Sequence, residues 1–139
     1  MKYSYDSIKL NHTIEVEYEI TEIVYNNFLN TFLDINPIHI DDDYAIRNGF
    51  KSKVMHGAIL NGFISNLIGV HFPGHDSLIH FVHIDFHSPL FLYDKIKILA
   101  KVIQKVESIP AIIISMRIQN LQTDKLIAKA KVQVGFVTI

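Results

Sequence analysis

The stretch from Val54 to Phe72 is the most apolar long segment of the chain, and it constrains the fold more than any other feature. Polar residues interrupt it at His56, Asn61, Asn66 and His71, whereas a helix that crosses a bilayer needs about 20 largely apolar residues. We therefore predict that the stretch forms a buried helix, which begins at Gly57 and runs to Gly69 or Val70. Because apolar residues occur all around this helix, nearly all of its faces need to be covered.

Strand patterns on both sides of this helix can supply that cover. Residues 13–20 alternate between apolar side chains and glutamates, which is typical of a half-buried strand. After Pro73 and Gly74, which end the helix, strand character continues over residues 78–86, 95–106, 111–120 and 126–137. The links between these strands have the length of hairpins, as in antiparallel sheets. We predict an α+β fold, a single domain over residues 1–139, in which an antiparallel sheet wraps around the apolar helix.

The segment between the first strand and the apolar helix carries capping and breaking residues. The predicted elements are, in order, a helix that Thr21 caps and that runs to Leu33, a loop over residues 34–40, and a short helix that Asp41 caps and that runs to Arg47 or Asn48. The loop is predicted because Pro37 lacks an N–H and biases Asn36 away from helical dihedrals. Gly49 is expected to end the short helix in a left-handed conformation.

Composition narrows the classes of function. Hydrophobic residues make up 49% of the chain and charged residues 19%, which indicates more buried surface than a monomer needs, so we expect a homodimer or higher homo-oligomer. A formal charge of −1 gives no global reason to bind nucleic acid or an anionic membrane. The absence of cysteine excludes a disulfide, a thiolate metal site and a cysteine nucleophile. The first residues lack the pattern of a signal peptide, so a cytoplasmic protein is expected.

Two short segments concentrate residues that can carry chemistry: Asp34-Ile35-Asn36-Pro37-Ile38-His39, and His56-Gly57 at the start of the apolar helix. A carboxylate and an imidazole five positions apart, across a loop stiffened by proline, can act on one water molecule and move protons. Gly57 offers a free N–H at a helix N-terminus, with no Cβ to obstruct a substrate. Such an N–H can stabilise a developing oxyanion.

These residues resemble a known family, the MaoC-like (R)-specific enoyl-CoA hydratases, which have the hotdog fold. The matching positions are Asp34-x-Asn36-Pro37-x-His39, then Asp41, Tyr44, Ala45, Gly49-Phe50 and Val54-x-His56-Gly57. The resemblance covers residues 13–137, at the level of motifs between 34 and 69 and of strand pattern elsewhere. It departs from the family at Leu33, where a glycine is usual, and at Ala58, where the family commonly has methionine.

The resemblance implies an activity and assigns roles. Asp34 and His39 would bind the attacking water, the N–H of Gly57 would polarise a thioester carbonyl, and Ser65 would support the site by hydrogen bonding. The implied reaction interconverts trans-2-enoyl and (R)-3-hydroxyacyl thioesters of coenzyme A or acyl carrier protein, without a metal or redox cofactor. Hotdog proteins generally dimerise by joining their sheets edge to edge, and the resemblance implies the same here.

Further residues are predicted to line or support this site. Asn36 and His56 are expected to support or line the pocket. Arg47, Lys51 and Lys53 can form a basic rim for the phosphates of coenzyme A or of the phosphopantetheine of a carrier protein. Large residues such as Phe63 and Phe136 suggest a bounded pocket and therefore short acyl groups.

Histidines elsewhere in the chain raise the question of a metal site. On a regular strand His80 and His83 point to opposite faces, so we expect that they share no ion and that the protein has no metal site. The same alternation places His80, Val82, Ile84 and Phe86 on one face.

Two other functions remain open on the sequence. A hotdog thioesterase would attack the carbonyl carbon and release free thiol from a saturated acyl-CoA. A non-catalytic hotdog subunit would bind acyl thioesters without turning them over.

Overall fold

The computed structural model describes residues 3–137 of the chain. The elements are, in order, a 3-10 turn η1 (Tyr5–Ser7), β1 (Thr13–Glu19), α1 (Glu22–Phe32), α2 (Pro37–Ile40), α3 (Asp42–Arg47), α4 (Ile59–Asn66), a π-helical segment η2 (Leu67–His71), β2 (Ser77–Phe86), β3 (Lys95–Val106), β4 (Ala111–Asn120) and β5 (Leu126–Phe136). No helix within this described range is long and apolar enough to cross a membrane.

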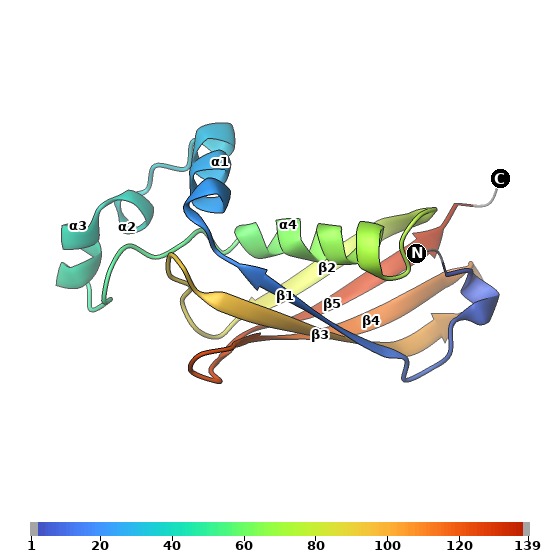
Figure 1. The fold of residues 1–139 in the computed structure, drawn as a ribbon. Coiled ribbons are helices and arrows are strands. Elements are labelled where there is room, and N and C mark those ends of the chain that lie inside the picture. The colour runs from blue at the N-terminus through green and yellow to red at the C-terminus, as the bar shows by residue number, and fades with distance from the viewer. Residues whose placement is uncertain (1–2, 138–139) are drawn as a thin grey trace.

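Five strands form one antiparallel sheet in the order β1-β3-β4-β5-β2, so that β1 and β2 are its edges. The sheet curves around α4, which lies along its concave face (Figure 1). At one end of the sheet α1 stands on the same side as α4, and α2 and α3 extend beyond that end (Figure 1). The predicted α+β fold, a sheet wrapped around the apolar helix, is confirmed.

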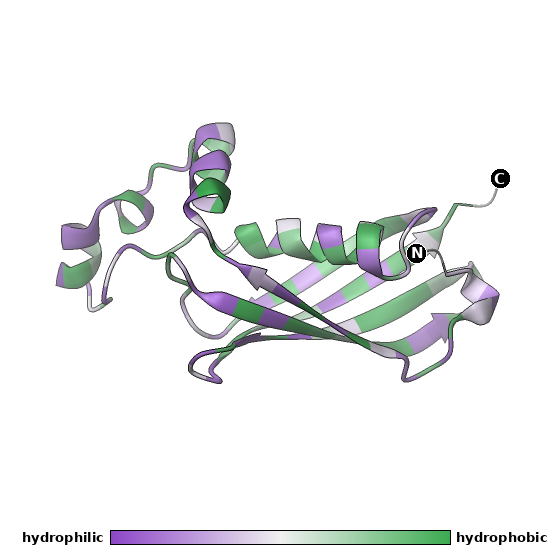
Figure 2. Cartoon of the chain, in the orientation of Figure 1, coloured by the Kyte–Doolittle hydropathy of each residue, from purple (hydrophilic) through white to green (hydrophobic). Residues whose placement is uncertain are grey.

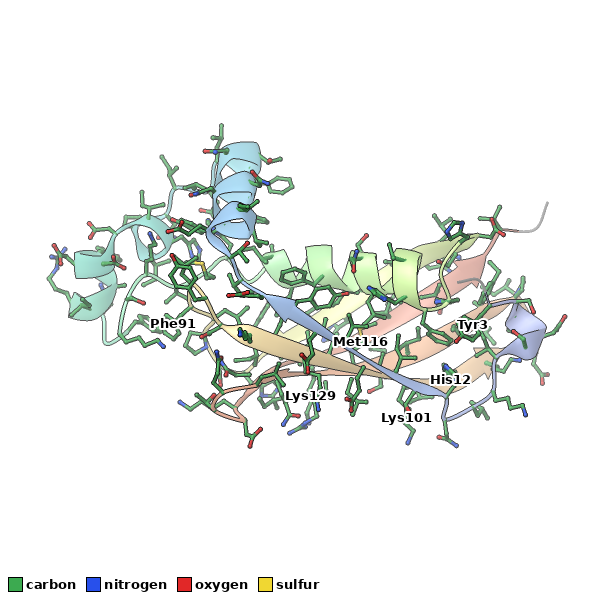
Figure 3. The ribbon with its side chains drawn as sticks, in the orientation of Figure 1. Tyr3, His12, Phe91, Lys101, Met116 and Lys129 are labelled. Atoms are coloured by element: carbon green, nitrogen blue, oxygen red, sulfur yellow. The ribbon has the colours of Figure 1, made fainter. Side chains whose placement is uncertain are left out.

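The hydrophobic core lies between α4 and the sheet. Every second residue of β4 from Ile112 to Ile118 is buried, as expected where successive side chains of a strand point to opposite faces. Leu60, Ile64 and Leu67 meet this face from α4 and η2. Figure 2 shows hydrophobic residues recurring along the inner strands and on α4. On the other face of the sheet, Lys101 and Lys129 point away from α4 (Figure 3).

The apolar helix is less completely covered than the sequence predicts. The chain makes a turn at Gly57 and Ala58 and then forms α4, which η2 continues. The helical segment ends before Pro73. Small and polar residues form an exposed face: Asn61, Gly62, Ser65, Asn66 and Gly69. The prediction that nearly all faces are covered is therefore wrong for the single chain, because this side of the helix is not apolar.

Residues 37–40 were predicted as part of a loop, and they form α2 instead. Pro37 occupies the first turn of α2, where its missing N–H would have no helical partner in any case. The side chain of Asn36 caps this turn by accepting a hydrogen bond from the N–H of Ile38 at 3.2 Å. The other predictions here are confirmed, since Asp41 caps α3 and Gly49 follows it with a φ of +90°.

A β-bulge in β2 corrects the predicted alternation of that strand. The pairing of β2 with β5 shifts register between Ile79 and Phe81, so His80 has no partner residue in the ladder. The ring of His80 lies against Gly135, where a Cβ would overlap it, and its Nδ1 accepts a hydrogen bond from Gln133 at 3.0 Å.

The bulge places His80 and His83 on the same outer face of the sheet. His83 pairs with the exposed Lys131, whereas Ile84 pairs with the buried Ala130. The prediction that the two histidines point to opposite faces is therefore wrong, because an inserted residue reverses the alternation.

Candidate active site

Two helix ends place Asp34 and His39. Helix α1 ends where Leu33 takes the left-handed conformation, with a φ of 55°, and the chain turns away from the helix axis at Asp34. His39 lies in the single turn of α2 that begins at Pro37. Oδ2 of Asp34 and Nε2 of His39 are 3.8 Å apart, which is too far for a direct hydrogen bond. One water molecule can contact both atoms across this gap.

The hydrogen bonds of His39 indicate which of its nitrogens carries a proton. Nδ1 lies 2.7 Å from the carbonyl oxygen of Val54, which can only accept, so Nδ1 donates. In the neutral ring Nε2 is then an acceptor, and it faces the carboxylate of Asp34. The side chain of Asp34 is 52% exposed and that of His39 is 17% exposed. Two acceptors at the edge of solvent can each take one hydrogen of a bound water.

Asn36 organises the loop that carries this Asp34–His39 pair, hereafter the dyad. Its N–H donates to Oδ1 of Asp34 at 3.2 Å, and its side chain caps α2. Oδ1 of Asp34 is thereby engaged, while Oδ2 remains directed toward His39. The supporting role that the sequence predicts for Asn36 thus has a defined contact in the structure.

His56 lies directly behind the dyad. It is 2% exposed, and its ring lies against His39 at a centroid distance of 4.1 Å and against Phe28 at 4.7 Å. Its Nε2 is 2.8 Å from the carbonyl oxygen of Asp34, so Nε2 donates and ties the Asp34 backbone to the start of the apolar helix. Nδ1 of His56 is buried and has no hydrogen-bond partner among residues 3–137.

Asp34, His39 and His56 are the one group within the described part of the chain whose ligand atoms lie close enough to share a metal ion, within 4.8 Å of one another. An ion needs lone pairs that converge on one point, and imidazole lone pairs lie in the ring plane. The two rings are packed against each other, tilted by 31°, and each already donates one N–H to a backbone carbonyl. This arrangement suits packing and hydrogen bonding better than shared ligation.

Tyr25 is a member of the site that the sequence reasoning missed. It is buried on α1, and its hydroxyl donates to the carbonyl oxygen of His39 at 2.6 Å. Burial, together with the negative charge of Asp42, raises the pKa of Tyr25, so the hydroxyl keeps the proton that it donates. Only the folded position of α1 brings this residue to the dyad, and no local motif marks it.

Gly57 presents a free N–H beside the dyad. Its carbonyl accepts a hydrogen bond from Leu60 and so begins α4, while its N–H has no acceptor within the described part of the chain. A Cβ at this position would lie 2.8 Å from Cε1 of Phe86, so the absence of a side chain lets the Phe86 ring pack there. The expectation of an unobstructed N–H at the start of the helix therefore has a physical basis.

A pocket of about 640 Å³ contains both His39 and Gly57. Apolar side chains supply most of its wall, including Met55, Phe86 and Leu90. A pocket of this size and polarity, with few polar groups, is typical of small-molecule sites. It places an imidazole and a free backbone N–H in one cavity, with the Asp34 carboxylate at its edge.

The other predicted site residues are dispersed. Ser65 lies on the exposed face of α4 and does not line the pocket that contains His39 and Gly57. Arg47 is exposed at the end of α3. Nζ of Lys51 lies 4.4 Å from the ring centroid of Phe91, at the end of the molecule that carries α2 and α3 (Figure 3), and Nζ of Lys53 lies 4.8 Å from that of Tyr25. The three cations therefore do not form one continuous rim.

Comparison with protein families gives one match that spans most of the chain. Residues 7–125 match the sequence model of a family described as MaoC like domain.

Individual relatives agree with this family. Over 92 residues, 66% of this chain and 64% of the relative, the chain is 28% identical to an (R)-specific enoyl-CoA hydratase of Rhodospirillum rubrum. Over 63 residues, 45% of this chain and 37% of the relative, it is 33% identical to a mitochondrial 3-hydroxyacyl-[acyl-carrier-protein] dehydratase of Arabidopsis thaliana. In both cases the matched part is less than two thirds of the curated relative.

Solved structures give the same fold. The unliganded R-hydratase of Pseudomonas aeruginosa superposes with a TM-score of 0.87 at 23% identity, over 98% of this chain and 86% of that one. At this identity the likeness concerns the fold, which is the hotdog fold that the resemblance implied.

Proposed function

The chain belongs to the MaoC-like domain family, and on that premise we propose that it interconverts trans-2-enoyl and (R)-3-hydroxyacyl thioesters. Relatives named as an enoyl-CoA hydratase and a 3-hydroxyacyl dehydratase support a hydratase or dehydratase activity. The observation that carries the proposal is the 3.8 Å gap between Oδ2 of Asp34 and Nε2 of His39, beside a pocket that contains the N–H of Gly57.

Each step of the reaction has a group to perform it. A water held between Asp34 and His39 attacks C3 of the enoyl thioester, and Asp34 accepts the proton that the water loses. The thioester carbonyl gains negative charge as the C2–C3 double bond is consumed, and the N–H of Gly57 stabilises that charge. The dyad then returns one proton to C2, so the enzyme ends as it began. Dehydration follows the same path in reverse.

The substrate carries coenzyme A or the phosphopantetheine of an acyl carrier protein, and the reaction as proposed uses no metal or redox cofactor. Hydration of a double bond changes no oxidation state overall, and the proton transfers need only the dyad. The carrier is identified by comparing the two thioesters of the same enoyl group as substrates.

We further propose that the protein is a homodimer that joins the β2 edges of two sheets. β2 is an edge strand of ten residues, and Leu78, Phe81, Val82 and Phe86 on it are exposed. A long edge strand with exposed apolar side chains is an aggregation hazard unless a partner covers it. Size-exclusion chromatography with light scattering should give a dimer, and a stable monomer at micromolar concentration would contradict this arrangement.

The experiment that tests the activity is hydration of crotonyl-CoA, followed by loss of enoyl absorbance, with chiral analysis of the product. The proposal predicts formation of (R)-3-hydroxybutyryl-CoA. Release of free thiol from saturated acyl-CoA, with no loss of enoyl absorbance, would identify a thioesterase instead. Binding of an acyl-CoA analogue without turnover of any enoyl thioester would identify a non-catalytic subunit.

A further inference from the structure

A second hollow lies beside the catalytic pocket, between α1 and α4. Its volume is about 880 Å³, which lies within the range of about 300–1,000 Å³ typical of ligand sites. Ala58 and Asn61 line both this groove, hereafter the α1–α4 groove, and the pocket that contains His39 and Gly57. The two hollows therefore meet at the first turn of α4.

The walls of the α1–α4 groove are mostly apolar, and the polar side chains among them are neutral amides and hydroxyls. Phe28 and Phe32 form one side, with their ring centroids 4.8 Å apart. Tyr18 and Phe63, which also line the groove, are stacked on each other at a centroid distance of 4.5 Å with an interplanar angle of 25°. Among residues 3–137, no Asp, Glu, Lys, Arg or His lines this groove.

The hydroxyl at the far end of the groove is neutral as well. The Tyr18 hydroxyl donates to Oδ1 of Asn66 at 2.8 Å. Burial raises the pKa of Tyr18 to about 12, so this group carries no charge at physiological pH. Such a lining suits a hydrocarbon chain better than a phosphate, because most of it is apolar and it brings no cation.

A third hollow adjoins the catalytic pocket, and unlike the α1–α4 groove it is lined by charged side chains. Its volume is about 400 Å³, and it shares Ser88, Pro89 and Ile127 with the catalytic pocket. Lys51 and Lys125 line it. Asp94 lines it too, but its Oδ2 accepts a hydrogen bond from the N–H of Phe91. Ammonium groups at this end can meet phosphates.

The three hollows thus follow one another in order: the one lined by Lys51 and Lys125, then the pocket that contains His39 and Gly57, and then the mostly apolar α1–α4 groove. A thioester substrate has the same order, with phosphates at one end, the reactive enoyl carbonyl between, and the alkyl chain at the other end. We propose that the α1–α4 groove binds the acyl chain of a medium- or long-chain thioester, while the carrier end extends toward Lys51 and Lys125. This proposal rests on the proposed function, and it replaces the expectation of short acyl groups.

Gly62 and Gly69 provide a matched pair of variants for the test. Both are exposed, and a Cβ at either position would meet nothing within 4 Å, but only Gly62 lines the groove. Gly62→Leu should fill the groove without disturbing the fold, because leucine favours a helix more than glycine does. Gly69→Leu is its control, because Gly69 does not line the groove. Thr31→Phe fills it from α1, with Asn30→Phe as its control, because Asn30 is exposed on α1 outside the groove.

The expected result is selective for chain length. Each methylene removed from water contributes about a fourfold gain in affinity. The parent protein and both control variants should therefore prefer trans-2-dodecenoyl-CoA to crotonyl-CoA in kcat/KM. Gly62→Leu and Thr31→Phe should lower kcat/KM for dodecenoyl-CoA at least tenfold and leave that for crotonyl-CoA within about twofold.

Three results would overturn the acyl site while leaving the hydratase proposal in place. They are an unchanged kcat/KM for both substrates in the filled variants, an equal loss on both substrates, and a parent protein that hydrates crotonyl-CoA but not dodecenoyl-CoA. An equal loss accompanied by a change in oligomeric size would assign the groove to a second copy of the chain.

Measuring the affinity for saturated acyl-CoAs tests the acyl site without relying on turnover. Dodecanoyl-CoA and acetyl-CoA cannot be hydrated, and calorimetry measures their affinities directly. If the parent protein hydrates no enoyl-CoA, the proposed function fails. The acyl site still stands if Gly62→Leu weakens dodecanoyl-CoA binding at least tenfold and acetyl-CoA binding little. Equal affinity of the parent and Gly62→Leu for dodecanoyl-CoA would overturn it.

Discussion

At the scale of single residues, two buried side chains hold the backbone of the dyad from outside its loop. His56 donates to the carbonyl of Asp34, and Tyr25 donates to that of His39. Tyr25 belongs to α1, and His56 packs against α1 through the rings of Tyr25 and Phe28. The position of the reacting atoms therefore depends on residues that need not touch the substrate.

Tyr25→Phe tests this dependence with the least change of shape. Removing the hydroxyl leaves the carbonyl of His39 without its partner, which costs on the order of 1–3 kcal/mol in the free energy of unfolding. We expect kcat for crotonyl-CoA hydration to fall about tenfold with KM nearly unchanged, since the substrate contacts remain. Steady-state kinetics and urea denaturation measure both effects. A variant that loses stability but keeps the full kcat would show that Tyr25 is merely structural.

Gly57→Ala tests the approach to the free N–H. The added methyl would lie 2.8 Å from the ring of Phe86, but that ring is 58% exposed and can move, so the fold should persist. We expect at least a tenfold loss of hydration, because a methyl on Gly57 narrows the pocket beside the free N–H. The double variant Gly57→Ala/Phe86→Ala should not recover activity. Full recovery would show that displacement of the ring, and not obstruction of the N–H, causes the loss.

At the scale of elements, the bulge in β2 links the edge strand to β5 through one close contact. A Cβ on Gly135 would overlap the ring of His80, so glycine is required where this ring lies against the strand. Gly135→Ala should lower the free energy of unfolding by about 1–3 kcal/mol, as overpacking typically does. Adding His80→Ala should restore most of that loss, as measured by urea denaturation of the single and double variants. No loss in Gly135→Ala would contradict the contact.

Elements with a strict pattern were predictable, and those that depend on context were not. β3 and β4 begin and end where the sequence predicts, because both are long apolar-rich segments bounded by short, turn-like links. α2 was missed because Pro37 was read as a helix breaker, although proline is also favoured in the first turn of a helix. The bulge at His80 could not be predicted from the sequence of β2 alone, because it depends on the space that Gly135 leaves in β5.

Some residues of the candidate site could likewise be predicted from a local motif, and others could not. Asp34, His39 and Gly57 stand out in the sequence because their spacing forms a motif, and the structure brings them to one pocket or its edge. Tyr25 stands out in no pattern, since its contact with His39 spans 14 residues and depends on how α1 packs. Ser65 was expected to support the site, but the single chain exposes it, and its role stays a prediction.

At the scale of the whole molecule, the fold separates two tasks. The sheet and α4 form the hydrophobic core, and the segment from α1 to α2, at one end of the sheet, carries the dyad (Figure 1). The start of α4 joins the two parts, because Gly57 begins that helix and His56 ties it to Asp34. Changes to the dyad should therefore alter catalysis while the core remains intact.

The most direct test of the central claim is crotonyl-CoA hydration by Asp34→Asn and His39→Ala. Asparagine cannot take a proton from water, and alanine removes the second acceptor, so each variant should lose at least about a hundredfold in kcat/KM. Both should keep the circular dichroism spectrum and the denaturation midpoint of the parent within a small margin. Turnover near that of the parent in both variants would contradict the account, because the water would then be activated without the dyad.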